Sequence, residues 1–372
     1  MKILYVITGL GVGGAENLLV DVCGAIKEKH TVTVVYFSPD KTEFKQQVTD
    51  MGIEIKLIKS TGLNIMIPLF KLIRLFRKYD VIHTHLPRAD FMCRFGMILS
   101  FSKKRFFTTV HNTDRWRKAE TFTTKILTCI DRLTINKFRN ITLIAVSESV
   151  KRYCVECEGI LPEKIRVIPN FVDIGNKYKK LGNFNVQRFR KDYKNIMIVV
   201  GRLEEQKGHI YLLKAIKELC HDRGYEDIHL YVLGQGSLEK KMKIFVEENK
   251  IGRHITFLGF RRNVYDFVSG SDLFILPSLF EGFGLCTLES FNCGTPVLVS
   301  DIDVNRELTN GGKCGILFRV GDSSDLADKI QEFFDNKVDK GAYIKNGFER
   351  AKSFSIDYHI EQLEKIYAEG LL

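Results

Sequence analysis

Short apolar runs that alternate with helical segments constrain the fold of this 372-residue chain more than any other feature. In the first half, strands are predicted at 3–7, 31–37, 53–58, 81–83, 106–110 and 143–146. A second alternation has strands predicted at 196–200, 229–233, 255–259, 273–276, 295–300 and 315–318. Strands that alternate with helices form parallel sheets, and ligands bind at the carboxyl ends of such strands. We therefore expect an α/β protein with two Rossmann-like sheets.

The length supports two domains, because single hydrophobic cores rarely grow beyond about 250–300 residues. We place an N-terminal Rossmann-like domain at 1–174 and a polar, poorly periodic linker at 175–195. The second Rossmann-like domain is expected at 196–352. The final segment, 353–372, is predicted to form a helix with one apolar face, made by Ile360, Leu363, Ile366 and Tyr367.

The first loop of the chain contains a glycine pattern. Gly9, Gly11 and Gly14 match GxGxxG between the first strand and the first predicted helix. Such a loop exposes backbone amides at a helix N-terminus, where phosphate binds. A dinucleotide site also has an acidic residue about 20 residues further on, at the end of the second strand. Here Asp40 is displaced beyond Pro39, so the fit to a nicotinamide site is weak.

The charge is divided unevenly along the chain. Residues 1–180 hold 30 Lys and Arg against 17 Asp and Glu, and the remainder holds 26 against 28, which gives a net charge of +11. A basic amino-terminal half indicates an anionic partner on one face. Two segments, 62–79 and 91–107, interleave apolar and basic residues, as does the loop around Trp116. This arrangement suits an anionic membrane surface.

The simpler interpretation of each segment is an ordinary amphipathic helix packed on the sheet. In the first segment the packed stripe is predicted to be Leu63, Ile67, Phe70, Ile73 and Phe76. We weigh the two interpretations about equally when the segments are taken together with the charge.

Nine scattered cysteines indicate reduced thiols in the cytoplasm. Cys154 and Cys157 form a lone CxxC, and without a second pair or a histidine cluster we expect neither zinc nor redox use. The amino terminus lacks a signal-peptide pattern, and no run of 18 apolar residues predicts a transmembrane helix. We expect a cytoplasmic protein that is peripheral on the inner face of the plasma membrane if the basic half contacts lipid.

Histidines and cations lie at the carboxyl ends of several predicted strands. His83 and His85 lie at the end of one strand, and His111 lies at the end of another. A lone histidine more often packs or caps than reacts, but a loop after a strand is where ligand residues gather. In the second half, Arg202 and Lys207 follow a strand, where a guanidinium fork and an ammonium can hold a diphosphate. Two such cations alone are more often solvated surface residues.

Two carboxylates eight residues apart, Glu281 and Glu289, flank a glycine-marked turn after the run 273–276. We expect Glu281 in the loop and Glu289 on a helix predicted over 285–293. A fully helical spacing would hold the acids roughly 12 Å apart, whereas glycosidase pairs lie at most about 9.5 Å apart. The two acids are therefore expected to contact different parts of one hydroxyl-rich ligand.

Five motifs together resemble the retaining GT-B glycosyltransferases of family 4, the glycosyl transferases group 1. They are Gly13-Gly-Ala-Glu16, Gly201-Arg202, Lys207-Gly208, Phe257-Leu-Gly259 and Glu281 to Glu289. Their order and spacing match the family over nearly the whole chain. The resemblance implies two Rossmann-like domains that face each other across a cleft, with a final helix that crosses back to the N-terminal domain.

The resemblance also implies roles for residues. Arg202 and Lys207 would bind the donor diphosphate, Glu289 would bind the ribose, and Glu281 would bind the transferred sugar. His111 would contact the donor sugar near the reaction centre, which makes His111, Glu281, Arg202 and Lys207 the candidate catalytic residues. The other candidate donor-binding residues are Gly13, Gly14, Gly234, Phe260, Phe283, Gly284 and Leu285.

These roles predict transfer of a sugar from a nucleotide-diphosphate sugar to a glycan or lipid-diphosphate-linked acceptor, in surface polysaccharide or glycoconjugate biosynthesis. UDP-sugars are favoured, and GDP-sugars stay an alternative because Phe260 and Arg261 do not identify the base. Two cations and helix N-termini can neutralise the leaving group, so we expect no metal and no cofactor. No nucleic-acid partner is expected.

Two alternatives stay open from the sequence alone. One is an NAD(P)-dependent oxidoreductase that uses the loop of Gly9, Gly11 and Gly14, although this leaves the loops of the second half unexplained. The other is a catalytically silent sugar-binding relative, because transfer depends on a closure of the domains that the sequence does not determine.

Overall fold

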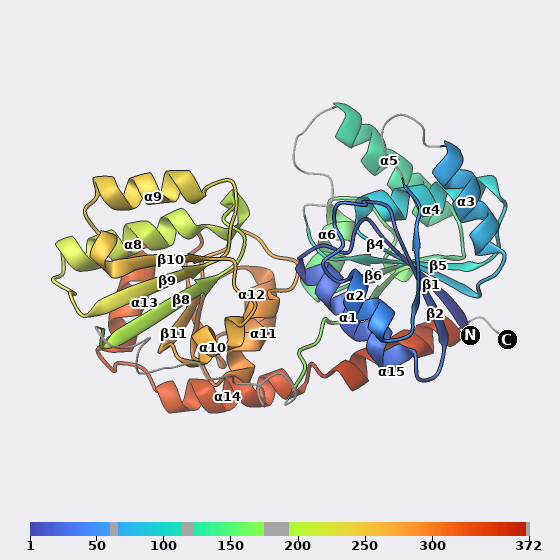
Figure 1. Ribbon diagram of the computed structural model, residues 1–372. Helices are drawn as coiled ribbons and strands as arrows, with labels where there is room; N and C mark the ends of the chain where they lie inside the picture. The colour runs from blue at the N-terminus through green and yellow to red at the C-terminus, as the bar shows by residue number, and fades with distance from the viewer. Residues whose placement is uncertain (60–65, 114–121, 175–192, 370–372) are drawn as a thin grey trace. The chain divides into compact units, whose positions relative to one another are not determined.

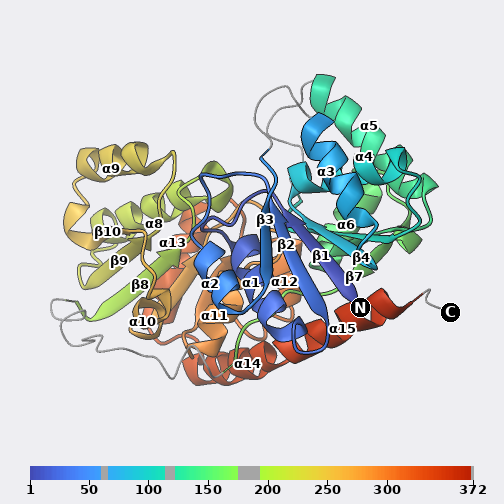
Figure 2. The same ribbon diagram turned by 45° about the vertical axis from the view of Figure 1, so that its right-hand side comes forward.

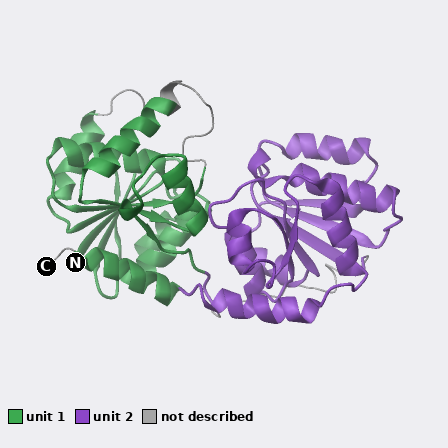
Figure 3. Ribbon diagram, turned by 180° about the vertical axis from the view of Figure 1, so that it is seen from behind, with its two compact units in different colours: residues 1–171, 356–372 green, residues 172–355 purple. Residues whose placement is uncertain are grey.

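The computed structural model describes residues 1–59, 66–113, 122–174 and 193–369. The chain forms two compact units, coloured separately in Figure 3. Unit 1 comprises Met1–Phe171 and Ile356–Leu372, and unit 2 comprises Val172–Ser355. The expected linker falls almost entirely on 175–192, which lies outside the described residues.

Unit 1 is built on a parallel sheet of seven strands in the order β3-β2-β1-β4-β5-β6-β7 (Figure 1). The central strands bury nearly every side chain, as expected for strands covered by helices on both faces. The strands are β1 (Lys2–Ile7), β2 (Thr31–Tyr36), β3 (Glu54–Leu57), β4 (Val81–His85), β5 (Arg105–Val110), β6 (Ile141–Ala145) and β7 (Ile165–Val167).

Helices cover both faces of this sheet. Figures 1 and 2 show α3, α4 and α5 together on one side, whereas α1 and α15 lie on the other. The helices are α1 (Gly14–Ile26), α2 (Lys45–Asp50), α3 (Met66–Phe76), α4 (Pro87–Leu99), α5 (Phe122–Lys137), α6 (Glu148–Glu156) and α15 (Ile356–Ala368), with one 3-10 turn, η1 (Pro162–Lys164).

The last helix, α15, belongs to unit 1 although unit 2 precedes it in the chain. The apolar face predicted for this segment is confirmed, because Ile360, Leu363, Ile366 and Tyr367 are all buried. Nδ1 of His359 also lies 2.7 Å from the carbonyl oxygen of Pro169 in the same unit. The crossing of the final helix back to the amino-terminal half therefore has a packed core as its physical basis.

Unit 2 is built on a second parallel sheet, of six strands, in the order β10-β9-β8-β11-β12-β13. The strands are β8 (Asn195–Val200), β9 (Ile228–Leu233), β10 (Ile255–Gly259), β11 (Leu273–Leu276), β12 (Val297–Ser300) and β13 (Ile316–Phe318). The helices are α8 (His209–His221), α9 (Glu239–Glu248), α10 (Val264–Ser269), α11 (Leu285–Asn292), α12 (Asp303–Leu308), α13 (Ser323–Phe334) and α14 (Lys340–Lys352), with 3-10 turns η3 (Glu205–Lys207) and η4 (Gly252–His254). The α/β architecture with two Rossmann-like sheets is thus confirmed.

The packing predicted for the segment 62–79 is wrong in part. In α3 the buried side chains are Pro68, Leu69, Leu72 and Phe76. Ile67 and Phe70, which the sequence places in the packed stripe, are 56% and 65% exposed. Leu63 and the loop around Trp116 lie outside the described residues. The helix is apolar on most of its circumference, so its periodicity does not determine which side packs on the sheet. None of the helices in the described ranges is long and apolar enough to cross a bilayer.

Candidate active site

An ion pair joins Lys207 and Glu281 beyond the carboxyl ends of β8 and β11. Nζ of Lys207 lies 2.5 Å from Oε1 of Glu281, and Oγ of Ser278 donates to the same oxygen at 2.6 Å. The two side chains are only 14% and 7% exposed. Burial, the largest single influence, lowers the pKa of Lys207, but the Glu281 carboxylate and Cys286 together raise it, so that the pKa is raised overall. Lys207 is therefore an ammonium ion at neutral pH.

A second cation, Arg202, lies beside this pair at the end of β8. Its Nη2 donates to Oε1 of Gln206 at 3.3 Å, and Nε2 of Gln206 donates to the carbonyl oxygen of Phe280 at 3.0 Å. The amide of Leu279 also donates to the carbonyl oxygen of Gln206 at 2.8 Å. These hydrogen bonds connect the loop after β8 to the loop after β11. They therefore hold Arg202, Lys207 and Glu281 in fixed positions relative to one another.

The backbone of this edge requires glycine at two predicted site positions. Gly234, after β9, has a φ of +139°, and a Cβ there would lie 1.8 Å from the carbonyl oxygen of Gly201. Gly284 has a φ of +80° and forms the N-cap of α11. A larger residue at either position would displace the loops that carry the charged side chains.

The positions expected for the two carboxylates are confirmed. Glu281 lies in the loop after β11, and Glu289 lies on α11. The hydroxyl of Tyr265, on α10, donates to Oε1 of Glu289 at 2.8 Å. Both acids therefore accept hydrogen bonds from neighbouring side chains, and the N-terminus of α11 lies between them in sequence. Free amides at a helix N-terminus attract anions.

Three other predicted donor-binding residues differ in their exposure to solvent. Phe283 is 3% exposed, and its ring packs edge-on against Phe354 at 5.7 Å between centroids. Phe283 is thus buried as a whole residue. Phe260, after β10, is 45% exposed, and Leu285 is the first residue of α11 and partly buried. Unit 2 accordingly gathers Arg202, Lys207, Gly234, Phe260, Glu281, Phe283, Gly284, Leu285 and Glu289 at the carboxyl edge of its sheet.

The remaining predicted site residues belong to unit 1. Gly13 is the N-cap of α1, Gly14 is its first residue, and His111 follows β5. His83 and His85, expected at the carboxyl end of a strand, do lie there, and the strand predicted over 81–83 extends to His85 with both side chains buried. Nδ1 of His85 lies 3.0 Å from Nε2 of His111, and the rings of His83 and His85 stack with centroids 4.5 Å apart.

A hydroxyl network anchors these histidines to the last helix. Nε2 of His83 lies 2.8 Å from Oγ1 of Thr109, and its Nδ1 hydrogen-bonds the hydroxyl of Tyr367 on α15. The hydroxyls of Tyr367 and Tyr5 lie 3.2 Å apart. Burial, followed by the charge of His359, lowers the pKa of His111 to about 4. Burial likewise holds the pKa of His83 and His85 well below the ordinary value. All three imidazoles are neutral at pH 7.

The glycine loop after β1 is occupied by its own chain. A Cβ on Gly9 would lie 2.9 Å from Cβ of Lys41, and one on Gly11 would lie 3.2 Å from the same atom. The amide of Leu10 donates to the carbonyl oxygen of Lys41 at 2.9 Å. The glycines therefore make room for the segment after β2. This contact accounts for the glycine pattern without a dinucleotide.

Asp301 and Asp303 form an Asp-x-Asp sequence, although no carboxylate pair of the metal-dependent kind was expected in this chain. Nη2 of Arg306 donates a hydrogen bond to Oδ2 of Asp301 at 2.7 Å. Hydrogen bonds from Arg306 lower the pKa of Asp301. Asp303 begins α12. Within the described ranges, the structure has no group of three or more His, Cys, Asp or Glu side chains arranged to hold a metal ion.

Comparisons with known proteins agree with these features. The model of Glycosyltransferase Family 4 matches residues 12–176, and the model of Glycosyl transferases group 1 matches residues 183–350. The chain belongs to this family of glycosyltransferases. The two matched segments thus coincide with the two alternating series of strands and helices.

Curated relatives of the glycosyltransferase include two bacterial enzymes. The chain is 27% identical over 289 residues to the Escherichia coli UDP-Gal:alpha-D-GlcNAc-diphosphoundecaprenol alpha-1,3-galactosyltransferase, covering 76% of this chain and 73% of the relative. It is 24% identical to the Staphylococcus aureus capsular polysaccharide biosynthesis glycosyltransferase CapH over the full length of both. Among solved structures, Anabaena HepE in complex with UDP-glucose superposes with a TM-score of 0.84 at 20% identity, over 99% of each chain. The GT-B fold is thereby confirmed.

Several residues of the glycosyltransferase site are absent from the sequence-based prediction. Ser278, Gln206 and Tyr265 hold Glu281, Arg202 and Glu289 respectively. Gln206 is adjacent to Lys207, so the loop composition offered a signal for it. No pattern in the sequence connects Tyr265 to Glu289 or Tyr367 to His83, because these pairs meet only in the folded chain.

Proposed function

We propose that this glycosyltransferase moves a sugar from a UDP-sugar to a lipid-linked or polysaccharide acceptor, with retention of the anomeric configuration. The observation that carries the proposal is the Lys207–Glu281 pair, held by Ser278 beside Arg202 at the carboxyl edge of the unit 2 sheet. A buried ammonium beside a guanidinium and a helix N-terminus is suited to a diphosphate.

Each charged group has a proposed contact with the donor. Arg202 and Lys207 bind the diphosphate, and Glu281 accepts hydrogen bonds from hydroxyls of the transferred sugar. Glu289, oriented by Tyr265, accepts hydrogen bonds from the ribose. Gly234 and the amides near Gly284 and Leu285 let the backbone approach the donor, while Phe260 lies near the base.

Unit 1 contributes the acceptor side in this proposal. His111 contacts the donor sugar near the reaction centre as a neutral imidazole, since its pKa is lowered to about 4. Gly13 and Gly14 approach the phosphates through backbone amides at the start of α1. The hydrogen bond between His85 and His111 limits rotation of the His111 ring.

The proposed reaction is a displacement on one face of the sugar. The bond between the anomeric carbon and the diphosphate oxygen breaks, and the acceptor hydroxyl oxygen bonds to the same carbon from the same face. The acceptor proton passes to the departing diphosphate oxygen. Negative charge grows on the diphosphate as the bond breaks, so fixed cations at that position lower the barrier.

Three features support this mechanism over an enzymatic nucleophile. Oε1 of Glu281 accepts hydrogen bonds from both Lys207 and Ser278, which reduces its nucleophilicity. Glu289 is likewise hydrogen-bonded by Tyr265. Lys207, Arg202 and the N-terminus of α11 supply positive charge to the leaving group, so we propose that transfer is independent of a metal ion.

The names of similar proteins support the substrate classes. The Escherichia coli relative is named for a UDP-Gal donor and a diphosphoundecaprenol-linked acceptor. The Staphylococcus aureus relative is named for capsular polysaccharide biosynthesis, and the Anabaena neighbour was crystallised with UDP-glucose. All nine cysteines are free thiols, which is consistent with a reducing, cytoplasmic compartment.

The first experiment identifies the donor and then removes the charges. Thermal shift with UDP, GDP and their common sugars should show stabilisation by UDP compounds, since a ligand of the folded state raises its stability. Lys207→Ala should then lower kcat about 100-fold or more, in line with loss of one preorganised group. Glu281→Gln should reduce transfer as well, and NMR of the product should show the donor's anomeric configuration.

A matched control is Lys240→Ala, which removes an exposed lysine of α9 in the same unit. The control should keep full activity. Unchanged transfer in both Lys207→Ala and Glu281→Gln would overturn the proposed site, and an inverted product would overturn the proposed mechanism. Stabilisation by GDP compounds alone would overturn the UDP assignment.

A further inference from the structure

Exposed apolar side chains gather on one side of unit 1. Of the 18 large hydrophobic residues that are exposed in the described ranges, nine belong to α3, to α5, to the carboxyl end of α4 or to Phe101, two residues beyond α4. We refer to these nine as the apolar face: Met66, Ile67, Phe70, Phe95, Leu99, Phe101, Ile126, Ile130 and Leu133. Figures 1 and 2 both show α3, α4 and α5 together. Large apolar side chains that are exposed on neighbouring helices indicate an interaction surface.

The position of α3 fixes which of its apolar residues remain uncovered. α3 packs on α4 at Gly96, where a Cβ would lie 3.0 Å from Cδ1 of Leu69 and 3.3 Å from the ring of Phe76. This close contact buries one side of α3 and leaves Ile67 and Phe70 at the opposite side, more than half exposed. Their exposure follows from the packing of the helix and not from a frayed end.

A buried ion pair fixes α5 in a similar way. Arg94 of α4 hydrogen-bonds the carboxylate of Asp131 on α5, and both side chains are almost completely buried. On the opposite side of α5, Ile126, Ile130 and Leu133 are exposed at steps of four and three residues. This spacing is that of one helical face. These three residues are the part of the apolar face that α5 contributes.

Within the described residues, the exposed charges of α3, α4, α5 and the segment 100–105 are of one sign. Exposed cations on α3 and after α4 include Lys71, Arg74, Arg77 and Lys103. The acidic residues of α4 and α5, Asp90 and Asp131, are buried. α3 and the segment 100–105 contain no acidic residue. Repulsion between these cations makes an anionic partner favourable.

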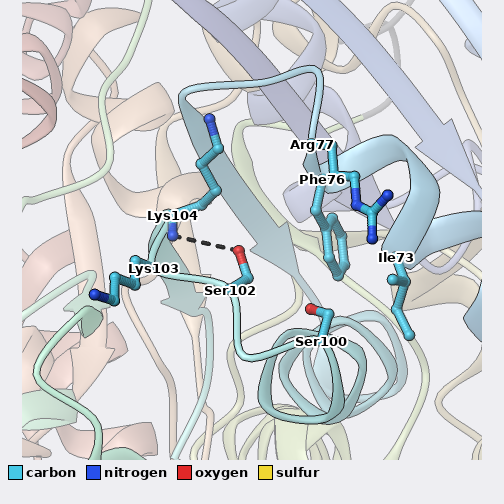
Figure 4. A pocket seen from close by; sticks show the side chains of 7 residues that line it. All are labelled: Ile73, Phe76, Arg77, Ser100, Ser102, Lys103 and Lys104. Carbon is cyan, nitrogen blue, oxygen red and sulfur yellow. Dashed lines mark hydrogen bonds between the residues drawn. The ribbon is translucent and has the colours of Figure 1, made fainter.

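A pocket lies at the border between the apolar face and these cations. It is lined by Ile73, Phe76 and Arg77 from the end of α3, and by Ser100, Ser102, Lys103 and Lys104 (Figure 4). Oγ of Ser102 accepts a hydrogen bond from the amide of Lys104 at 3.3 Å, which leaves the serine proton for a ligand. Arg77, Lys103 and Lys104 form no ion pair with any described residue. Guanidinium, ammonium and hydroxyl groups together suit a phosphate.

We propose that the apolar face docks on a membrane that contains anionic phospholipid, with a headgroup phosphate in the pocket of Arg77, Ser102, Lys103 and Lys104. In this arrangement Ile67, Phe70 and Leu133 enter the boundary between headgroups and acyl chains. The surrounding cations remain at headgroup level, where anionic lipid attracts them. The positive charge around the apolar face favours anionic lipid. The exposed apolar side chains set how deeply the face inserts.

The test is flotation of the full chain with phosphatidylcholine vesicles, with and without phosphatidylglycerol. We expect binding to the anionic vesicles at low salt and weaker binding as salt increases. Arg77→Gln/Lys103→Gln/Lys104→Gln should weaken binding on the order of 100-fold, since each surface cation contributes about fivefold. Ile67→Ser/Phe70→Ser should also release the protein, and these exposed substitutions should leave the fold intact.

A matched control removes three exposed lysines of unit 2, Lys240→Gln/Lys241→Gln/Lys345→Gln, and should bind as the wild type does. Inorganic phosphate at the headgroup concentration should not release the protein from vesicles, which distinguishes a bilayer from a free anion. No binding at low salt, or equal loss in the control, would overturn the proposal. So would a dimer that Phe70→Ser dissociates, because a second copy would then cover the face. Vesicle binding needs no sugar donor, so its outcome is separate from that of the transfer assay.

Discussion

The carboxyl edges of the two sheets follow the same strand order, but one edge carries charged side chains and the other carries neutral ones. In unit 2 the loops after β8 and β11 hold a buried ion pair, Lys207 with Glu281, beside a second cation. In unit 1 the ends of β4 and β5 hold imidazoles, and low pKa values keep His83, His85 and His111 neutral. The fold thus places equivalent loops, and the side chains on those loops decide their chemistry.

This difference suggests a division of work in sugar transfer. A leaving diphosphate gains negative charge and is best met by fixed cations, which unit 2 provides. An acceptor hydroxyl and a neutral sugar need oriented hydrogen bonds without strong charge, which suits neutral imidazoles. Three predictions test the contrast between a charged edge and a neutral one.

The largest effect on stability is expected from Lys207→Met. The substitution leaves the Glu281 carboxylate buried without its cation, and breaking such a pair typically costs about 3–5 kcal/mol. Urea unfolding at pH 7 should show this decrease in the free energy of unfolding. Adding Glu281→Gln to the variant should restore part of the loss, because the remaining group is neutral. A double variant as unstable as the single one would contradict the charged-edge interpretation.

A smaller effect is expected from acid, and mainly in unit 1. His111 has a folded pKa of about 4 against about 6.5 unfolded. Between pH 6.5 and 4 the unfolded chain therefore binds the proton that the folded chain excludes, and stability falls as the pH falls. Linkage gives roughly 2 kcal/mol lost between pH 7 and 5 for one such histidine.

Hydrogen–deuterium exchange can separate the two units in this experiment. Peptides from β4 and β5 should lose more protection at pH 5 than peptides from β8 and β11, after correction for the intrinsic rate. Unit 2 should also respond, because burial lowers the pKa of His209 and His229 there to about 4. Its response should be the smaller one, since unit 1 contains four histidines whose pKa burial lowers, His83, His85, His111 and His359. His111→Gln should reduce the response of unit 1. Equal responses of the wild type and the variant would show that another group titrates.

The smallest effect is expected from Tyr367→Phe. The substitution removes the hydroxyl that links Tyr5 and His83, and loss of a buried hydrogen bond costs about 1–3 kcal/mol when a partner stays unsatisfied. Urea unfolding and exchange in β4 report the change. Tyr211→Phe in unit 2 is the matched control, because its hydroxyl has no hydrogen-bond partner in the described part of the chain. If Tyr367→Phe lowered the free energy of unfolding as much as Lys207→Met does, the proposed difference between the charged and the neutral edge would be contradicted.

Strand order and the placement of the acids were predictable from sequence because both depend on local patterns. Apolar runs separated by helices imply parallel sheets, and a glycine turn before a helix places Glu281 in a loop and Glu289 on α11. The full length of β4 was not predicted. The predicted strand stops at His83, but β4 continues to His85, because Tyr367, Thr109 and His111 supply hydrogen-bond partners for the two buried histidines.

Side-chain partners and surface packing required the structure for a different reason. Tyr265 and Glu289 are 24 residues apart, and Tyr367 and His83 are 284 apart, so no local pattern connects them. In α3, two overlapping stripes both have helical spacing, and only contact with Gly96 of α4 selects the buried one. Ile67 and Phe70 were therefore assigned to the wrong side.

The position of α15 also sets the order in which the protein can be completed during synthesis. Tyr5 is made before its partner Tyr367, which follows 362 residues later. At about 5–20 residues per second, this interval lasts roughly 20–70 s. Unit 2 is contiguous and can fold in that time, while unit 1 lacks the helix that covers Tyr5 and His83. The half of the enzyme that begins first is therefore the half that finishes last.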